Sequence, residues 1–157
     1  MKIKKILIIL SFFILSGCGY EPIYSKKNLG NEFNFSINRI EFSGEGIVNQ
    51  NLKDNLKNFI NIKSRTVKYD LNVNSSKIIT TTSKNKKGNP EIFYMKIIID
   101  LEVFQDDKLK NKKTFEDGFE YKNKSNKFQL RQYEESIIKN VVTKISNDIV
   151  DQLYSLK

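Results

Sequence analysis

Apolar residues recur along this chain with two different spacings, and the two spacings divide it into strands and helices. Apolar and polar positions alternate over residues 67–73 and 93–103, and each of these segments is predicted to be a strand. Another strand is predicted over residues 35–42 from the apolar residues Phe35, Ile37, Ile40 and Phe42. Residues 114–121 are predicted to be a further strand. Helical spacing predicts an amphipathic helix over residues 49–61.

The longest periodic pattern lies at the C-terminal end of the chain. Asn126, with Gln129 three residues later, is a suitable cap for the start of a helix. Apolar residues then form one stripe of about seven turns. The stripe consists of Leu130, Tyr133, Ile137, Val141, Ile145, Ile149 and Leu153, and it is widened by Ile138 and Val142. A stripe of this length predicts a long helix packed against a core.

These elements give the order β-α-β-β-β-α. The predicted fold class is α+β, with two helices packed on one face of a mostly antiparallel four-stranded sheet, because that arrangement buries both apolar stripes. The other face of the sheet is expected to be polar. Ile98 and Phe104 are predicted to point to that face, either as tolerated exposed residues or under a binding partner.

The first residues have the composition of an export signal. Lys2, Lys4 and Lys5 precede an apolar run from Ile6 to Leu15. As a helix this run is about 15 Å long, roughly half of a hydrocarbon core, so it is too short to span a membrane. Residues 1–17 are therefore predicted to be a signal peptide.

The signal peptide is followed by a sequence typical of lipoproteins. Leu15-Ser16-Gly17-Cys18 has the branched apolar residue, the two small residues and the cysteine of a lipobox. We expect cleavage before Cys18 and covalent attachment of diacylglycerol and an N-acyl chain to it, with no other cofactor. A secretory signal with an incidental cysteine is the alternative. Residues 18–34 would be a lipidated tether, and residues 35–157 a single α+β domain.

The composition restricts the possible chemistry. The chain has no histidine, and Cys18 is its only cysteine, so histidine-based catalysis, disulfides and most zinc or haem sites are excluded. Asp106-Asp107 and Glu134-Glu135 are adjacent pairs, which do not converge on a substrate as catalytic carboxylates do. We therefore expect neither an enzyme nor a metal site.

The chain carries 27 Lys and Arg residues against 18 Asp and Glu residues, a net charge of +9. Removal of the signal peptide leaves 24 basic residues and a charge of about +6, which favours an anionic partner. A gene rich in A and T would also enrich lysine, so local clusters are more informative than the total. Lys84, Lys86 and Lys87 lie in a predicted hairpin tip over residues 83–89, with Lys77 lower on the hairpin. A solvated, charged turn is the alternative interpretation.

The segment Gly17-Cys18-Gly19-Tyr20-Glu21-Pro22-Ile23-Tyr24 resembles the start of the lipopolysaccharide-assembly lipoproteins of the LptE family, particularly their alphaproteobacterial members. Looser similarity continues through Arg39–Phe42, Asn51–Leu56 and Tyr69–Val73, although Asp54 and Asn55 depart from the family's pattern.

The resemblance implies an outer-membrane protein that is lipid-anchored on the periplasmic side. Gly19, where an Asp would favour retention in the inner membrane, is consistent with this location. Its implied partners are an LptD-type β-barrel, which it plugs and helps to assemble, and lipopolysaccharide. Lys77, Lys84, Lys86 and Lys87 are the residues we expect to bind the phosphates of that glycolipid.

Two other functions fit parts of the sequence. An auxiliary lipoprotein of an ABC-type lipid transporter would have a similar anchor and size. A nucleic-acid binder is suggested by the charge and the aromatic content, but the aromatic residues occupy alternating buried positions rather than a basic face. We therefore expect no nucleic-acid partner.

Overall fold

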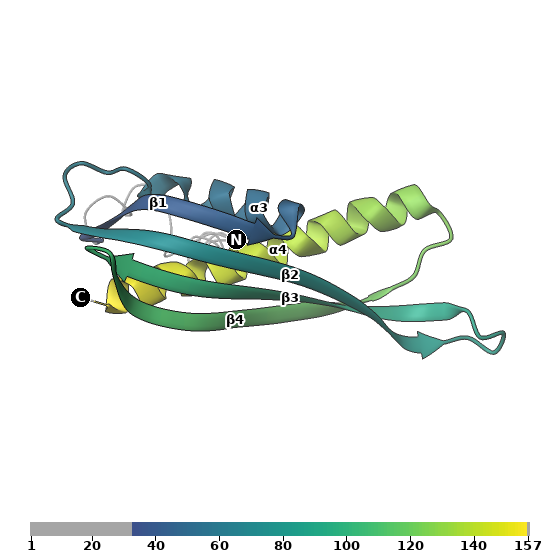
Figure 1. Cartoon of the computed structure of the whole chain (residues 1–157). Helices are drawn as coiled ribbons and strands as arrows, with labels where there is room; N and C mark the ends of the chain where they lie inside the picture. The colour runs from purple at the N-terminus through teal and green to yellow at the C-terminus, as the bar shows by residue number, and fades with distance from the viewer. Residues whose placement is uncertain (1–32, 157) are drawn as a thin grey trace, which may run out of the picture. The chain divides into compact units, whose positions relative to one another are not determined.

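The computed structural model describes residues 33–156. Its elements follow the predicted order β-α-β-β-β-α (Figure 1). They are β1 Phe35–Gly44, α3 Gly46–Leu56, the short 3-10 helix η2 Lys57–Phe59, β2 Val67–Lys84, β3 Pro90–Gln105, β4 Lys108–Lys122 and α4 Lys127–Ser155. The predicted α+β class is thus confirmed.

The four strands form one sheet in the order β1-β2-β3-β4. β1 pairs with β2 in parallel, whereas the β2–β3 and β3–β4 pairs are antiparallel. The parallel pair requires a crossover, and α3 provides it. Both helices lie on the same face of the sheet, as predicted (Figure 1).

The core lies between this face and the two helices. On β2 and β3 the odd-numbered residues face the helices, and they are buried along the length that the helices cover. These buried residues are Tyr69, Leu71, Val73 and Ser75 of β2 and Met95, Ile97, Ile99, Leu101 and Val103 of β3. The even-numbered residues form the outer face. Ile98 and Phe104 lie there half-buried, so the prediction that they point away from the helices is confirmed.

The C-terminal helix follows its predicted stripe closely. The side chain of Asn126 accepts hydrogen bonds from the backbone N–H groups of Phe128 and Gln129, which confirms the predicted cap. The stripe residues are buried, except for the half-buried Tyr133. α4 packs against both α3 and β4.

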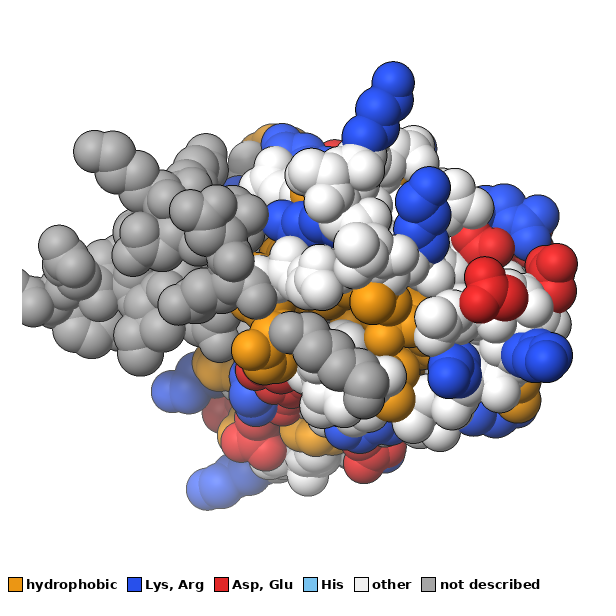
Figure 2. Space-filling model, turned by 90° about the vertical axis from the view of Figure 1, so that its left-hand side faces the viewer, with side chains coloured by type: hydrophobic (Ala, Val, Ile, Leu, Met, Phe, Trp, Pro, Cys, Tyr) orange, Lys and Arg blue, Asp and Glu red, His pale blue; other side chains and the backbone are white. Residues whose placement is uncertain are grey.

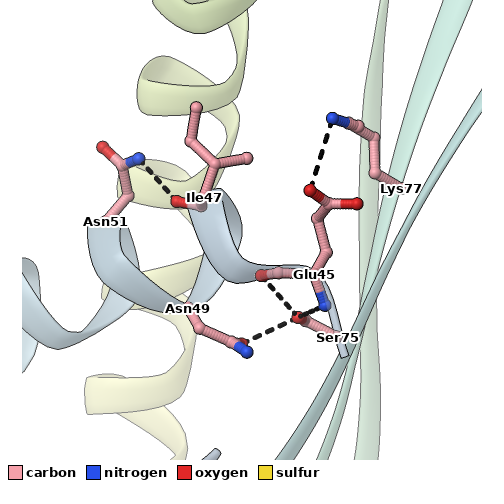
Figure 3. Close-up of polar contacts among 6 residues, drawn as sticks. All are labelled: Glu45, Ile47, Asn49, Asn51, Ser75 and Lys77. Atoms are coloured by element: carbon pink, nitrogen blue, oxygen red, sulfur yellow. Dashed lines mark hydrogen bonds and ion pairs between the residues drawn. The ribbon is translucent and has the colours of Figure 1, made fainter. Parts of the chain in front are cut away.

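The first helix begins three residues before the predicted start at residue 49, because a residue of the sheet helps to cap it. The buried Ser75 Oγ accepts a hydrogen bond from the backbone N–H of Glu45 and lies 2.7 Å from Asn49 Oδ1, as Figure 3 shows. No hydroxyl in the helix's own N-terminal segment makes this contact. The predicted end at residue 61 was also too late, since the α-helix stops at Leu56 and a 3-10 turn follows.

Gly44 ends the pairing of β1 with β2. Its φ is +87°, and a Cβ atom there would lie 1.9 Å from the carbonyl oxygen of Ser75. Only glycine fits this close approach. β1 then leaves the sheet, and among the described residues only β3 pairs with residues 76–84 of β2. This part of the β2–β3 hairpin projects beyond the helix α3 (Figure 1).

β4 begins at Lys108, six residues before the predicted start at residue 114. The segment between them is rich in lysine, which is a poor strand former by itself. Pairing with β3 extends the strand nevertheless, since Lys112 lies opposite Glu102 and its ammonium is 2.8 Å from that carboxylate. Cross-strand pairing therefore outweighs local propensity here.

Candidate glycolipid-binding surface on the hairpin

The tip of the β2–β3 hairpin is a compact turn held by Asn85. The Asn85 side chain accepts hydrogen bonds from the backbone N–H groups of Lys87 and Asn89, and the backbone N–H of Asn85 donates to the Asn89 carbonyl. Gly88 adopts a φ of +81°, which a glycine tolerates without strain. The turn therefore has a defined backbone from which its side chains project.

Three of the four lysines expected to bind glycolipid lie on this turn. Lys84, Lys86 and Lys87 are all exposed, and we call them the tip lysines. No ion pair among residues 33–156 involves any of them. Their ammonium groups are thus accessible to an anion from solvent.

The structure separates Lys77 from the tip lysines. Lys77 lies seven residues before Lys84 on β2, about 23 Å along an extended strand. Its side chain is 24% exposed, faces the helix side of the sheet and lies 3.5 Å from the carboxylate of Glu45 (Figure 3). Lys77 is therefore positioned to pair with the start of α3, away from the tip.

A cavity of about 520 Å³ lies at the base of the hairpin's tip turn, where Ile92 pairs with Ser83 of β2. We call it the hairpin-base pocket, and its lining combines apolar and aromatic surface with two lysines and one carboxylate. The lining residues are Ile92, Phe119, Glu120, Tyr121, Lys122, Lys124 and Tyr133. They come from β3, β4, the linker after β4, and α4.

An aromatic cluster packs along one side of this pocket. The rings of Phe93 and Tyr121 are 5.6 Å apart, and Tyr133 meets Tyr121 edge-on at 6.1 Å. The Tyr121 hydroxyl donates a 2.6 Å hydrogen bond to the carboxylate of Glu134. Burial and this hydrogen bond raise the pKa of Tyr121, so its hydroxyl stays protonated and Glu134 stays occupied with it.

Two lysines border the pocket. The ammonium of Lys124 lies 4.5 Å from the centre of the Tyr133 ring, a cation–π distance. Lys122 is exposed at the end of β4, opposite Ile92 of β3. The pocket thus places positive charge directly beside apolar surface.

The linker that carries these lysines is tied to the hairpin. The backbone N–H of Asn123 donates to the Glu91 carbonyl at 2.8 Å, and its side-chain amide donates to the Pro90 carbonyl at 2.9 Å. Pro90 in turn pairs with Lys84 across the hairpin. The hairpin-base pocket and the tip lysines therefore belong to one continuous surface.

Sequence reasoning named Lys77 and missed this pocket. Its residues are spread from position 92 to position 133, and no local spacing connects them. On the sequence alone, Lys122, Lys124 and Lys127 directly before the last helix are further possible contacts. Combined with the aromatic positions on the neighbouring strand, they were the available signal.

Two other surfaces are less suited to an anionic ligand. A cavity of about 600 Å³ on the outer face of the sheet is lined by the carboxylates of Glu41, Asp100 and Glu102, together with Lys112. The end of the domain opposite the hairpin tip shows basic and acidic side chains interspersed around an apolar centre, as seen on the visible part of that face in Figure 2. Both surfaces carry acidic groups beside their basic groups, so neither is purely positive.

Cys18 and the predicted signal peptide, residues 1–17, lie outside the described residues, so their roles stay predictions. Within residues 33–156 no helix is both long enough and apolar enough to cross a bilayer.

The fold is that of several solved bacterial lipoproteins. Rare lipoprotein B from Shewanella oneidensis superimposes with a TM-score of 0.57 at 15% identity, over 75% of this chain and 95% of that one. A minor lipoprotein from Acinetobacter baumannii gives 0.53 at 13% identity, over 74% and 90%. Lipoprotein B from Nitrosomonas europaea gives 0.57 at 9% identity, over 81% and 89%. At these identities the similarity establishes the fold.

No protein-family model and no curated protein matches the sequence.

Proposed function

We propose that this protein is an LptE-type outer-membrane lipoprotein. It plugs and helps to assemble an LptD-type β-barrel, and it binds lipopolysaccharide for insertion into the outer leaflet. It acts by binding, without catalysis, and is anchored on the periplasmic side through lipid on Cys18. The observation that carries the glycolipid-binding part is the placement of Lys122 and Lys124 beside the apolar hairpin-base pocket.

This surface fits the two parts of a phosphorylated, acylated glycolipid. Ammonium groups bind phosphates as point charges, and the ring and alkyl groups of Phe119, Ile92 and Tyr133 offer apolar surface to acyl chains. Phe119 is 48% exposed, so it contacts a ligand without rearrangement of the core. The tip lysines extend the positive charge along the same hairpin.

The sheet supports the proposed position inside a barrel. Porin-like lumens are polar. The outer face of this sheet carries polar side chains from each of the strands β2, β3 and β4. Asn72, Asn74, Asp100, Glu102 and Thr114 are examples on this face. Such a face can exchange its hydrogen bonds with water for hydrogen bonds with a polar wall.

The glycolipid proposal is tested with two sets of substitutions. Replacing Lys122 and Lys124 by Ser should weaken lipopolysaccharide binding about a hundredfold or more, because each lost charge-assisted contact is worth about 1.5–3 kcal/mol. Replacing all three tip lysines by Ser should weaken it further. Binding is measured by fluorescence titration of purified protein with labelled lipopolysaccharide.

Lys108 and Lys110 provide the matched control. Both are exposed lysines of β4, and they lie at the end of that strand away from the pocket. Replacing both by Ser removes the same charge elsewhere and should leave affinity nearly unchanged. Equal losses in the control and pocket variants would show that net charge alone attracts the glycolipid.

A further inference from the structure

An exposed tyrosine lies across the outer face of the sheet in the projecting part of the hairpin. Tyr94 of β3 is 36% exposed, and its even number places it on the outer face. A Cβ atom at Gly118 of β4 would lie 2.6 Å from the Tyr94 hydroxyl oxygen and 2.7 Å from its Cζ. The hydroxyl end of the ring therefore occupies the space that a side chain at position 118 would need.

Gly118 gives the ring a fixed place on the sheet. Glycine in the interior of a strand often marks a close approach by another group. Gly118 pairs with Lys96, which follows Tyr94 by two residues and shares its face. The missing side chain lets the ring extend along the sheet towards β4 instead of standing out into solvent. The ring is thus apolar surface that is already ordered before a ligand arrives, which lowers the entropic cost of binding.

Hydrogen-bonding groups surround this ring. Thr80 of β2 and Glu120 of β4 are both paired with Tyr94 in the sheet, so the three side chains share the outer face. Thr80 and Glu120 are exposed. Lys96, the next residue of β3 on this face, forms an ion pair with Glu116 at 2.6 Å. The ring therefore has a hydroxyl on one side, a carboxylate on the other and an ion pair beside it. We call Tyr94, Thr80, Glu120 and Lys96 the Tyr94 platform.

The platform is poorly suited to a phosphate or an acyl chain. A phosphate over the ring would face the Glu120 carboxylate directly, and Lys96 is already paired with Glu116. An acyl chain over the ring would remove the Thr80 hydroxyl and the Glu120 carboxylate from water without offering them a hydrogen bond.

A neutral saccharide avoids both penalties. Its C–H groups carry partial positive charge and can pack on the negative face of an aromatic ring. Its hydroxyl groups both donate and accept hydrogen bonds, so they can pair with the hydroxyl of Thr80 and the carboxylate of Glu120. The combination of an ordered ring with a polar rim therefore favours a sugar.

The platform adjoins the hairpin-base pocket. Ile92 and Glu120 line that pocket, and both are also neighbours of Tyr94. Glu120 lies directly opposite Tyr94 on β4, and Ile92 precedes Tyr94 by two residues on β3. A ligand held in the pocket can therefore continue onto the platform.

We propose that the Tyr94 platform binds the saccharide part of the glycolipid whose phosphates and acyl chains bind at the lysines and the hairpin-base pocket. The identity of the glycolipid rests on the proposed function. The contact between Tyr94 and a neutral sugar does not, so it is tested separately.

Saturation-transfer NMR with a neutral, phosphate-free oligosaccharide prepared from lipopolysaccharide tests this contact. The purified protein is held in a detergent without sugar groups, and its aromatic protons are irradiated. The parent protein should transfer saturation to the sugar protons. Tyr94→Leu should weaken binding of the oligosaccharide about three- to tenfold, because it removes the aromatic face. Tyr94→Phe keeps that face and should bind nearly as well as the parent.

Two controls separate the platform from other surfaces. Tyr154→Leu removes a tyrosine that is 43% exposed near the end of α4, and it should leave binding of the oligosaccharide unchanged. Replacing Lys122 and Lys124 by Ser should also leave it unchanged, because the oligosaccharide carries no phosphate. For the same reason, added salt should have little effect on its affinity. The circular dichroism spectra of all variants should match that of the parent.

The outcomes distinguish this inference from the proposed function. No transfer to the oligosaccharide in the parent, or equal affinity in the parent and Tyr94→Leu, would overturn the inference even if intact lipopolysaccharide binds through the lysines. Binding of the oligosaccharide that depends on Tyr94, in a protein that fails to bind intact lipopolysaccharide, would support the saccharide site and contradict the glycolipid-binding function.

Discussion

The two ends of the β2–β3 hairpin differ in what they bury. Where β1 and the helices cover the sheet, Leu71, Val73 and Ile99 are at most 2% exposed. In the projecting part Ile78, Ile79 and Tyr94 are 36–46% exposed. The same two strands therefore stabilise the fold at one end and present surface for binding at the other. Substitutions should separate these two roles.

The largest difference is expected between two aliphatic residues of the same strand. Leu71→Ala should lower the free energy of unfolding by about 2–5 kcal/mol, because it leaves a cavity in the core. Ile78→Ala removes a similar side chain from an exposed site and should change it by about 0.5 kcal/mol or less. Urea denaturation measures both. Similar losses would mean that the projecting part is packed like the core.

The cap of α4 should have an intermediate effect. Asn126→Ala removes the acceptor for the N–H groups of Phe128 and Gln129, which should cost about 1 kcal/mol. Because the helix start borders the hairpin-base pocket, glycolipid affinity should also fall in this variant. Asn126→Ser retains a capping oxygen and serves as the control, with most of the stability preserved.

A change at the hairpin tip should have a local effect. Gly88→Ala places a side chain at a φ of +81°, with nothing within 4 Å of the new Cβ. The strain is about 1 kcal/mol and falls on the turn. Hydrogen exchange should therefore quicken in residues 84–90 while core amides keep their protection. Equal loss of protection in the core would contradict the independence of the two ends.

The smallest effect concerns the ion pair between β4 and α4. The hydrogen bond from Lys144 lowers the pKa of Asp117. A group with a lowered pKa stabilises the fold above its ordinary pKa, and this contribution disappears as the pH falls through the lowered value. Lys144→Met should therefore reduce the loss of stability between about pH 5 and pH 2. The urea midpoint of both chains at each pH measures this.

The sequence was most informative where one periodic pattern dominates. The nine apolar positions of α4 and its Asn126 cap predicted the helix within a residue or two. The sequence was less informative where a residue far away along the chain determines where a helix or strand begins. Ser75 moves the start of α3 to Gly46, and pairing with β3 moves the start of β4 to Lys108.

The candidate site was only partly predictable for the same reason. The tip lysines are neighbours in sequence, so a turn was enough to bring them together. Lys77 was grouped with the tip lysines because it lies on the same hairpin. The tertiary fold decides which face of β2 carries its side chain, and it brings the Glu45 carboxylate beside it. The hairpin-base pocket needed the packing of α4 on β4, which no local pattern reveals.

Isolation of the protein from its native membranes tests the central proposal most directly. The protein should be purified under mild detergent conditions through a C-terminal tag, and the proteins that accompany it identified by mass spectrometry. A large outer-membrane β-barrel protein should be recovered in stoichiometric amount, together with a lipidated Cys18. Recovery with the ATPase or permease of a transporter, and without a barrel, would contradict it and favour the ABC-type auxiliary lipoprotein.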